Sequence, residues 1–153
     1  MKSSHLRLIS PFLSRVVLLV AISSLPTACK VPADPESTTQ EVTRSTLKVG
    51  ALINPLDDVE TRAVARVADA LQANVDLVAG DPHSLFALLE KGELHLIAGR
   101  IPSNTPFASD VGLTDPIGQV TVGDDTEDRV LAIRRGENRF LTTANRAIRA
   151  ISR

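Results

Sequence analysis

Short apolar strands alternate with amphipathic helices between residues 47 and 99, and this alternation limits the fold more than any other feature of the sequence. Three short, β-rich runs bounded by turn residues predict strands: LKVGALIN at 47–54, VDLVAG at 75–80 and ELHLIAG at 93–99. One helix is expected between each consecutive pair of strands. Strands joined in this way form βαβ units, whose parallel strands end at the same edge of a sheet, where ligands bind.

Both predicted helices carry start and stop signals. Asp57 or Asp58 can cap the first helix. Its apolar residues recur at steps of three and four, at Val59, Ala63, Val64, Val67, Ala68 and Leu71. Asp81 followed by Pro82 opens the second helix, and Gly92 ends it.

The C-terminal part of the chain predicts a further layer of structure. A long loop covers residues 100–116, and it is followed by a strand over 117–122, an acidic turn over 123–128, a strand over 129–135 and a helix over 138–152. Together with the βαβ units, these elements predict an α/β fold, a three-layer sandwich around a mostly parallel sheet.

The N-terminus has the pattern of an exported protein. Residues 1–28 combine basic residues, a short apolar run over 16–25 and small residues before Cys29, which indicates a signal peptide. The apolar run is about half the length that a membrane-spanning helix needs. Residues 30–46 are rich in Pro, Ser, Thr and charge, which predicts a flexible spacer before a folded domain over 47–153.

The segment LPTAC, which ends at Cys29, resembles the lipobox of bacterial lipoproteins. The resemblance implies that Cys29 is lipidated and that the lipid tethers residues 29–46 to a membrane; the alternative is an ordinary secretory signal that ends in Cys. Lys30, in place of Asp, implies sorting to the outer membrane. The expected location is therefore the periplasm or cell envelope.

Composition argues against several classes of function. The formal net charge is −1, so no basic excess predicts nucleic-acid binding. His5, His83, His95 and Cys29 do not have the spacing of metal ligands, and no G-x-S-x-G or phosphate-binding motif occurs. The sequence therefore predicts no metal, no cofactor and no enzyme.

Four segments, in order, resemble one family. They are LKVGAL at 47–52, LEKGELHLIAGRI at 89–101, LTDPI at 113–117 and VLAIRRGENRFLTTANRAIRAI at 130–151. They are similar to the first lobe of the amino-acid-type (family 3) periplasmic solute-binding proteins, which implies one lobe of a type II periplasmic-binding-protein fold. About a dozen residues separate LTDPI from the last strand, so the second lobe is expected to be absent.

The resemblance also indicates where the ligand site would lie and what it lacks. Phe107 stands where amino-acid binders carry the arginine that pairs with the ligand carboxylate, Asn104 stands where they carry Thr, and His95 stands where they carry Asp. A carboxylate needs a charge-assisted partner that Phe cannot supply. Arg100, which follows the third strand, is the expected substitute.

The candidate ligand-binding residues are Asn54, Arg100, Ser103, Asn104 and Thr105, all expected at the carboxyl edge of the sheet. Asp57 and His83 are expected at the same edge, where capping is the expected role of Asp57.

Two alternatives remain open in the long loop. Arg100 either binds a ligand or pairs with Asp110 or Asp115. The apolar side chains of the loop either form an exposed patch for a partner or fold back over the core; they are Phe107, Val111, Leu113 and Ile117.

Two functions follow as hypotheses. The first is a lipid-anchored, transporter substrate-binding-like protein that binds a small, amino-acid-like solute and presents it to an ABC permease or a sensor. The alternative is a degenerate lobe that acts without ligand as a protein-protein interaction module of the envelope.

Overall fold

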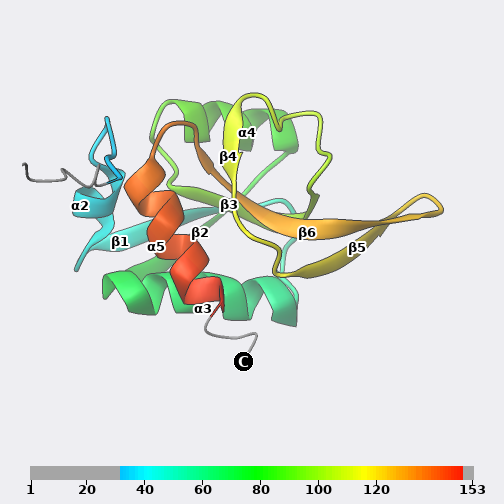
Figure 1. Ribbon diagram of the computed structural model, residues 1–153, viewed down its shortest axis with the longest axis horizontal. Helices are drawn as coiled ribbons and strands as arrows, with labels where there is room; N and C mark the ends of the chain where they lie inside the picture. The colour runs from blue at the N-terminus through cyan, green and yellow to red at the C-terminus, as the bar shows by residue number, and fades with distance from the viewer. Residues whose placement is uncertain (1–31, 150–153) are drawn as a thin grey trace, which may run out of the picture. The chain divides into compact units, whose positions relative to one another are not determined.

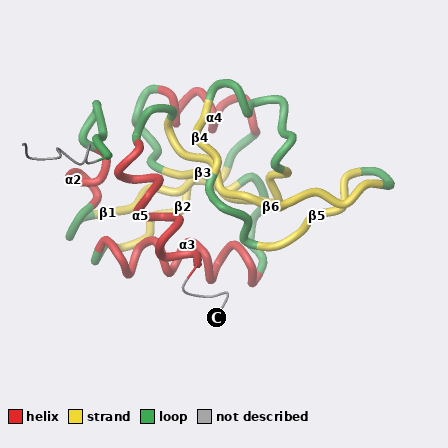
Figure 2. The backbone as a smooth tube through the Cα atoms, viewed as in Figure 1, coloured by secondary structure: helices red, strands yellow, loops and turns green. Residues whose placement is uncertain are grey.

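The computed structural model describes residues 32–149, which form a six-stranded sheet with helices on both faces (Figures 1 and 2). The elements in chain order are α2 (Thr38–Val42), β1 (Thr46–Ala51), α3 (Asp58–Leu71), β2 (Asn74–Ala79), α4 (Pro82–Glu90), β3 (Leu96–Pro102), β4 (Val111–Leu113), β5 (Gly118–Val122), β6 (Asp125–Arg134) and α5 (Asn138–Arg149). The expected signal peptide over 1–28 and the expected lipidation site Cys29 lie outside the described residues. Within residues 32–149, no helix has both the length and the apolar character that crossing a membrane requires.

The sheet has the strand order β2-β1-β3-β6-β4, and β5 pairs with β6. β1 runs parallel to β2 and to β3, as the βαβ pattern predicts. β6 runs antiparallel to β3, β4 and β5, so the sheet is mixed rather than mostly parallel. The antiparallel half arises because β5 turns directly into β6 through a tight hairpin and not through a crossover helix. The predicted α/β lobe is confirmed, with this refinement of its sheet.

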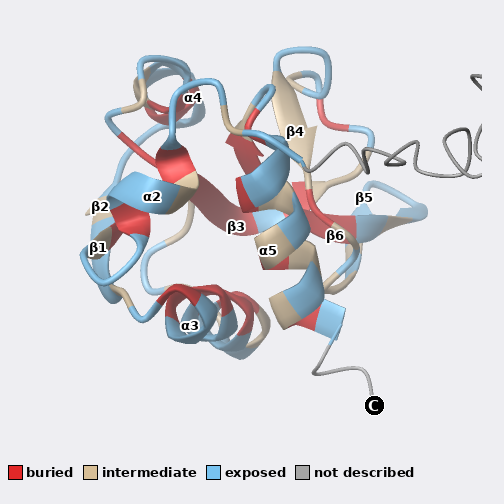
Figure 3. Cartoon of the chain, turned by 60° about the vertical axis from the view of Figure 1, so that its left-hand side comes forward, coloured by how far each residue is buried: buried red, intermediate tan, exposed pale blue. Residues whose placement is uncertain are grey.

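Two apolar clusters fill the space on either side of the sheet. One joins α3 and α5 to the sheet, and α3 turns its buried residues toward the sheet and its exposed residues toward solvent (Figure 3). The other joins α4 to the opposite face. The predicted three layers are therefore present, and the apolar face predicted for the first helix is buried from Ala63 to Leu71. Asp57 caps this helix as expected, because its side chain accepts hydrogen bonds from the backbone of Val59 and Glu60.

β3 begins three residues later than the predicted strand and contains an irregularity between Ile97 and Ile101. Gly99 and Arg100 have positive φ values of 135° and 56° there. A Cβ atom on Gly99 would lie 2.7 Å from the Cβ of Leu52, so this close approach of two strands requires glycine. The irregularity turns the backbone of Arg100 toward α3.

His95, expected within the strand, precedes it and is buried. Its Nδ1 atom accepts a hydrogen bond from the backbone N–H of Lys48 at 3.0 Å, and its Nε2 atom lies 3.4 Å from the Glu41 carboxylate. Because Nδ1 accepts, the neutral ring carries its proton on Nε2.

The predicted acidic turn over 123–128 is shorter than expected. β6 begins at Asp125, and only Gly123 and Asp124 separate the paired residues Val122 and Asp125. The resulting β5–β6 hairpin extends away from the helices at one end of the domain (Figure 1). A two-residue turn thus joins β5 to β6 within the stretch where the sequence predicted that a second lobe is missing.

The prediction of a flexible spacer over residues 30–46 is wrong from Asp34 onward. Val42 on α2 is fully buried in the α3–α5 cluster. The buried carboxylate of Glu137 accepts hydrogen bonds from the backbone of Glu36 and Thr38, each at 3.0 Å, and Asp34 accepts one from the backbone of Phe140 at 2.9 Å. The polar composition misled the prediction because one distant carboxylate, Glu137, and the segment's own Asp34 hold it to the domain with little apolar burial.

We expect Glu137→Gln to lower the free energy of unfolding by about 1–3 kcal/mol, because an amide NH₂ would face one of the two backbone donors that the carboxylate satisfies. Urea unfolding followed by circular dichroism measures the change. Glu93→Gln is the matched control, since it removes the same charge from an exposed side chain. Equal unfolding free energies for the two variants would contradict the role assigned to Glu137.

Burial lowers the pKa of His95 below its ordinary value, although Glu41 opposes this effect. The folded state therefore holds fewer protons than the unfolded state as the pH falls below about 6.5. The contribution of neutral His95 to stability is present above that pH and is lost as the pH falls further.

The expected result is a free energy of unfolding that decreases on acidification from pH 7 to pH 5, with a smaller decrease in His95→Asn. The Asn side chain can accept from the Lys48 N–H and does not titrate. His83→Gln removes an exposed histidine and should keep the slope of the unmodified protein. An unchanged slope in His95→Asn would show that His95 does not cause it.

Candidate functional site

The carboxyl ends of β1 and β3 meet the N-terminus of α3, and the predicted ligand-binding residues lie around this rim. Arg100 is the most exposed cation there, and its Nε lies 3.3 Å from the carboxylate of Asp57. The predicted alternative partners of Arg100 were wrong, since Asp57 takes that position. Asp115 instead pairs with Arg149 at 2.6 Å.

The other predicted residues do not converge on one point. Ser103 donates from its hydroxyl to Glu127 at 3.4 Å and from its backbone to Asp128 at 2.8 Å, so it contacts the β5–β6 hairpin. Thr105 is buried, whereas Asn54 and Asn104 are exposed. The structure therefore brings Arg100 to the rim as expected, without gathering the five residues around a single cavity.

A network of charged side chains that the sequence did not predict lies beneath the rim. Glu60 is fully buried on α3, and Arg129, at 6% exposure, projects from β6. Arg129 donates from Nε to Glu60 at 2.6 Å, and its Nη2 contacts the carboxylates of both Glu60 and Asp57. The backbone N–H of Arg100 also donates to Glu60 at 2.6 Å. Glu60 thus joins α3, β3 and β6.

The two carboxyl groups of this network have opposite pKa shifts. Contacts with the Glu60 carboxyl group and with the Arg129 guanidinium lower the pKa of Asp57 below its ordinary range. Burial, and then the neighbouring Asp57, raise the pKa of Glu60, while Arg129 opposes the rise. The contact between the two groups lowers the pKa of Asp57, whereas burial raises the pKa of Glu60, because a buried carboxylate loses its hydration, and the contact with Asp57 adds to this rise.

The network changes what the rim can do. Two cations, Arg100 and Arg129, face two carboxylates, Asp57 and Glu60, so the rim has no excess positive charge for a ligand carboxylate. An anionic group would have to compete with Asp57 for Arg100.

Both buried members of the network leave a signal in the sequence. Glu60 lies three, four, seven and eleven residues before Ala63, Val64, Val67 and Leu71, and so falls on the apolar face of α3. Arg129 alternates with Leu131 and Ile133 on β6. A charge on each of two buried faces could have suggested a pair, although nothing local specified that the two would meet.

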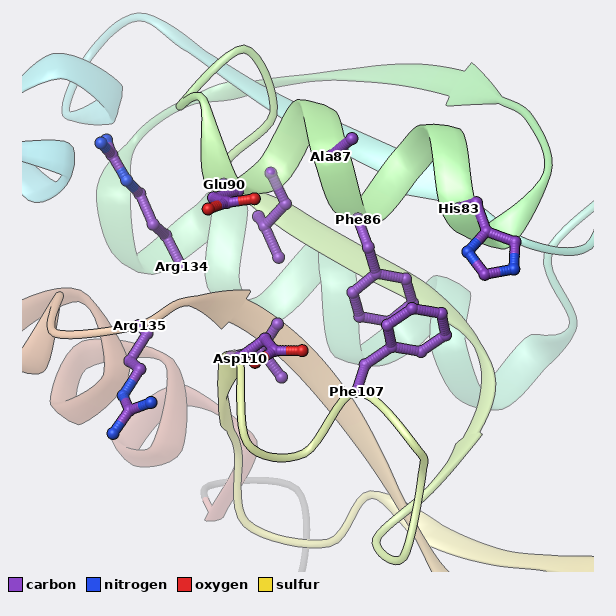
Figure 4. Close-up of a pocket in the computed structure, with 10 residues that line it drawn as sticks. His83, Phe86, Ala87, Glu90, Phe107, Asp110, Arg134 and Arg135 are labelled. Atoms are coloured by element: carbon purple, nitrogen blue, oxygen red, sulfur yellow. The ribbon is translucent and has the colours of Figure 1, made fainter.

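A cavity of about 480 Å³ lies away from the rim network, along α4. α4 forms one wall, the segment from Phe107 to Val111 forms the opposite wall, and Arg134 and Arg135 lie at one end (Figure 4). Phe107 stacks on Phe86 with ring centroids 4.0 Å apart.

The apolar residues of the long loop fold back over the domain, which settles the alternative left open by the sequence. Phe107, Val111 and Leu113 pack against the α4 cluster, and Ile117 packs against the α3–α5 cluster. Phe107 is therefore part of a packed wall and does not stand at the rim in place of an arginine.

No protein-family model matches this chain, and no curated protein matches it. Solved structures do match. The arginine-bound form of domain 1 from TmArgBP (T. maritima) has a TM-score of 0.60 and 19% identity, covering 70% of this chain and 94% of that one. The unliganded, open L-cystine solute receptor of Neisseria gonorrhoeae has a TM-score of 0.61 and 11% identity, covering 76% and 91%. An ancestral cationic amino acid solute-binding protein, AncCDT-1, has a TM-score of 0.64 and 13% identity, covering 76% and 94%.

These similarities, all at low identity, establish the fold: the described domain is structurally similar to a single lobe of the amino-acid periplasmic solute-binding proteins.

Glu60→Gln should lower the free energy of unfolding by about 3 kcal/mol, because it leaves the buried Arg129 without its main countercharge. The double variant Glu60→Leu/Arg129→Met should recover most of this loss, since removing both charges removes the desolvation cost. Chemical denaturation of the two variants measures the difference. If the double variant were as unstable as the single one, the network would not be the cause of the loss.

Proposed function

We propose that this chain is a solute-binding-protein-like lobe, held at a membrane of the cell envelope by a lipid on Cys29, that binds a small, amino-acid-like solute. The observation that carries the proposal is the similarity to domain 1 from TmArgBP, which is described in an arginine-bound form. Because domain 1 of that protein is described as arginine-bound by itself, the single lobe formed by residues 32–149 is compatible with solute binding.

The proposed contact residues are Asn54, Arg100, Ser103, Asn104 and Thr105 at the rim. Arg100 is the residue expected to carry the interaction, because its side chain is 60% exposed and its contact with Asp57 at 3.3 Å is long enough to exchange for a ligand carboxylate. Because Asp57 and Glu60 balance the positive charge of the rim, we expect weak binding and a preference for solutes that carry both a positive and a negative group.

The folded N-terminal segment supports an anchored position close to the membrane. Asp34 is already fixed to α5, so only the four residues 30–33 separate it from Cys29, and the five residue-to-residue steps span at most about 3.5 Å each. A lipid on Cys29 would hold the domain within about 20 Å of the bilayer surface, near an ABC permease or a sensor in the inner membrane, or facing inward from the outer membrane.

We propose no catalytic step, although one structural neighbour is described as a precursor of cyclohexadienyl dehydratase.

The second candidate is an interaction module of the envelope that acts without ligand. It is favoured by β2, which forms an edge of the sheet and exposes Val75 (42%) and Leu77 (52%). Apolar side chains on an edge strand are suited to a protein partner. This candidate requires that the domain respond to no solute.

Calorimetric and thermal-shift titration of residues 30–153 with amino acids, organic acids and short peptides separates the two candidates. We expect at least one amino-acid-like solute to bind saturably and Arg100→Gln to weaken it about tenfold, the loss of one charge-assisted contact. Arg139→Gln, which removes an exposed arginine from α5, should bind normally. No response to any member of the panel would reject solute binding and leave the interaction module.

A further inference from the structure

We propose that the groove between α4 and the Phe107–Val111 segment binds an amphipathic organic cation, an ammonium or guanidinium group on an apolar body, at a site separate from the rim. The cavity of about 480 Å³ lies within the size range of small-molecule sites. None of the rim residues proposed above lines it. The proposal therefore does not depend on solute binding at Arg100.

One end of the groove is a preformed apolar wall. The Phe86 and Phe107 rings are nearly parallel, with an interplanar angle of 8°, and His83 approaches Phe107 edge-on with ring centroids 5.7 Å apart. Phe86 is only 8% exposed, which fixes Phe107 against the body of the domain. Because this wall already packs on the core, a hydrocarbon ligand surface could be buried there with little reordering of the protein.

The other end of the groove supplies negative charge. Glu90, the last residue of α4, and Asp110, on the opposite segment, both line the cavity, and both are exposed. Within residues 32–149 neither carboxylate forms a salt bridge. Asp110 accepts only a neutral hydroxyl, that of Ser109, among the described side chains. Arg134 pairs with Glu36, so the two carboxylates outnumber Arg135, the remaining arginine of the lining. This excess of negative charge, with one carboxylate on each wall, favours a cation between them.

Two arginines lie at the same end of the groove as the carboxylates, and neither forms a salt bridge with Glu90 or Asp110. Arg134 lies 3.7 Å from the carboxylate of Glu36, and Arg135 donates to the carbonyl oxygen of Ser109 at 2.6 Å. In Figure 4 both guanidinium groups lie at the side of the groove away from the stacked Phe pair. Both arginines line the cavity, and in Figure 4 Glu90 and Asp110 lie nearer to the stacked Phe pair than the two guanidinium groups do.

Three matched probes test the assignment on residues 30–153: phenethylamine, which has the proposed chemistry; 2-phenylethanol, which lacks the charge; and phenylalanine, which adds a carboxylate. Chemical-shift titration by NMR should place phenethylamine at Phe86, Phe107 and Glu90. The neutral alcohol should bind at least about tenfold more weakly, and phenylalanine should bind no better than the amine.

Glu90→Gln and Asp110→Asn preserve shape and remove one charge each, and each should weaken phenethylamine binding about tenfold at an unchanged melting temperature, since both side chains are exposed. Glu93→Gln removes a nearby exposed charge outside the groove and should have no effect. Arg100→Gln, which tests the rim, should also leave amine binding unchanged.

Three results would overturn the proposal: no binding of phenethylamine at millimolar concentration, equal binding of amine and alcohol, or tighter binding of phenylalanine that depends on Arg135. If only Arg100→Gln abolished amine binding, the amine would bind at the rim. That result would reject the groove as the binding site and would keep the proposed solute-binding function.

Discussion

The buried carboxylate of Glu60 is the interaction on which the rim of this domain depends. It joins the first turn of α3, the backbone of Arg100 on β3 and the guanidinium of Arg129 on β6. Removing such a group from water is costly, and the cost is offset only because several donors meet the two oxygens. The geometry of the rim therefore follows from a contact inside the protein, because the same contact positions Arg100 and neutralises Arg129.

This arrangement explains why the domain keeps the fold of a solute-binding lobe while its rim differs from a simple anion site. The positive charge at the rim is balanced by Asp57 and Glu60 before any ligand arrives. Phe107, which the sequence places where an arginine is expected, has become part of an aromatic wall along α4. A cavity and two carboxylates without a salt bridge among the described residues lie beside that wall, so the two proposed sites differ in the charge of the ligand that each would accept.

The N-terminal segment shows how far composition can mislead. Its Ser, Thr and Pro content is typical of a linker, yet residues 34–45 form a strap that is fixed by Asp34 and by Glu137 and closed by the buried Val42. Charge-assisted hydrogen bonds to backbone N–H groups can order a polar segment without a large apolar surface. If Cys29 carries the proposed lipid, only a short tether would join it to a domain that begins at this strap, and the domain would be held close to the membrane.

Local patterns in the sequence determined α3, α4 and α5, the caps at Asp57 and Asp81, the two parallel strand pairs and most of the core, because helix and strand periodicity depends on neighbouring residues. The tertiary structure alone decided the pairing of Glu60 with Arg129, 69 residues apart, and of Glu137 with Thr38, 99 residues apart. It also decided the irregularity in β3 that turns Arg100 toward α3. Such contacts join segments that are distant in the chain, and only the packing of the sheet against its helices brings their charges together.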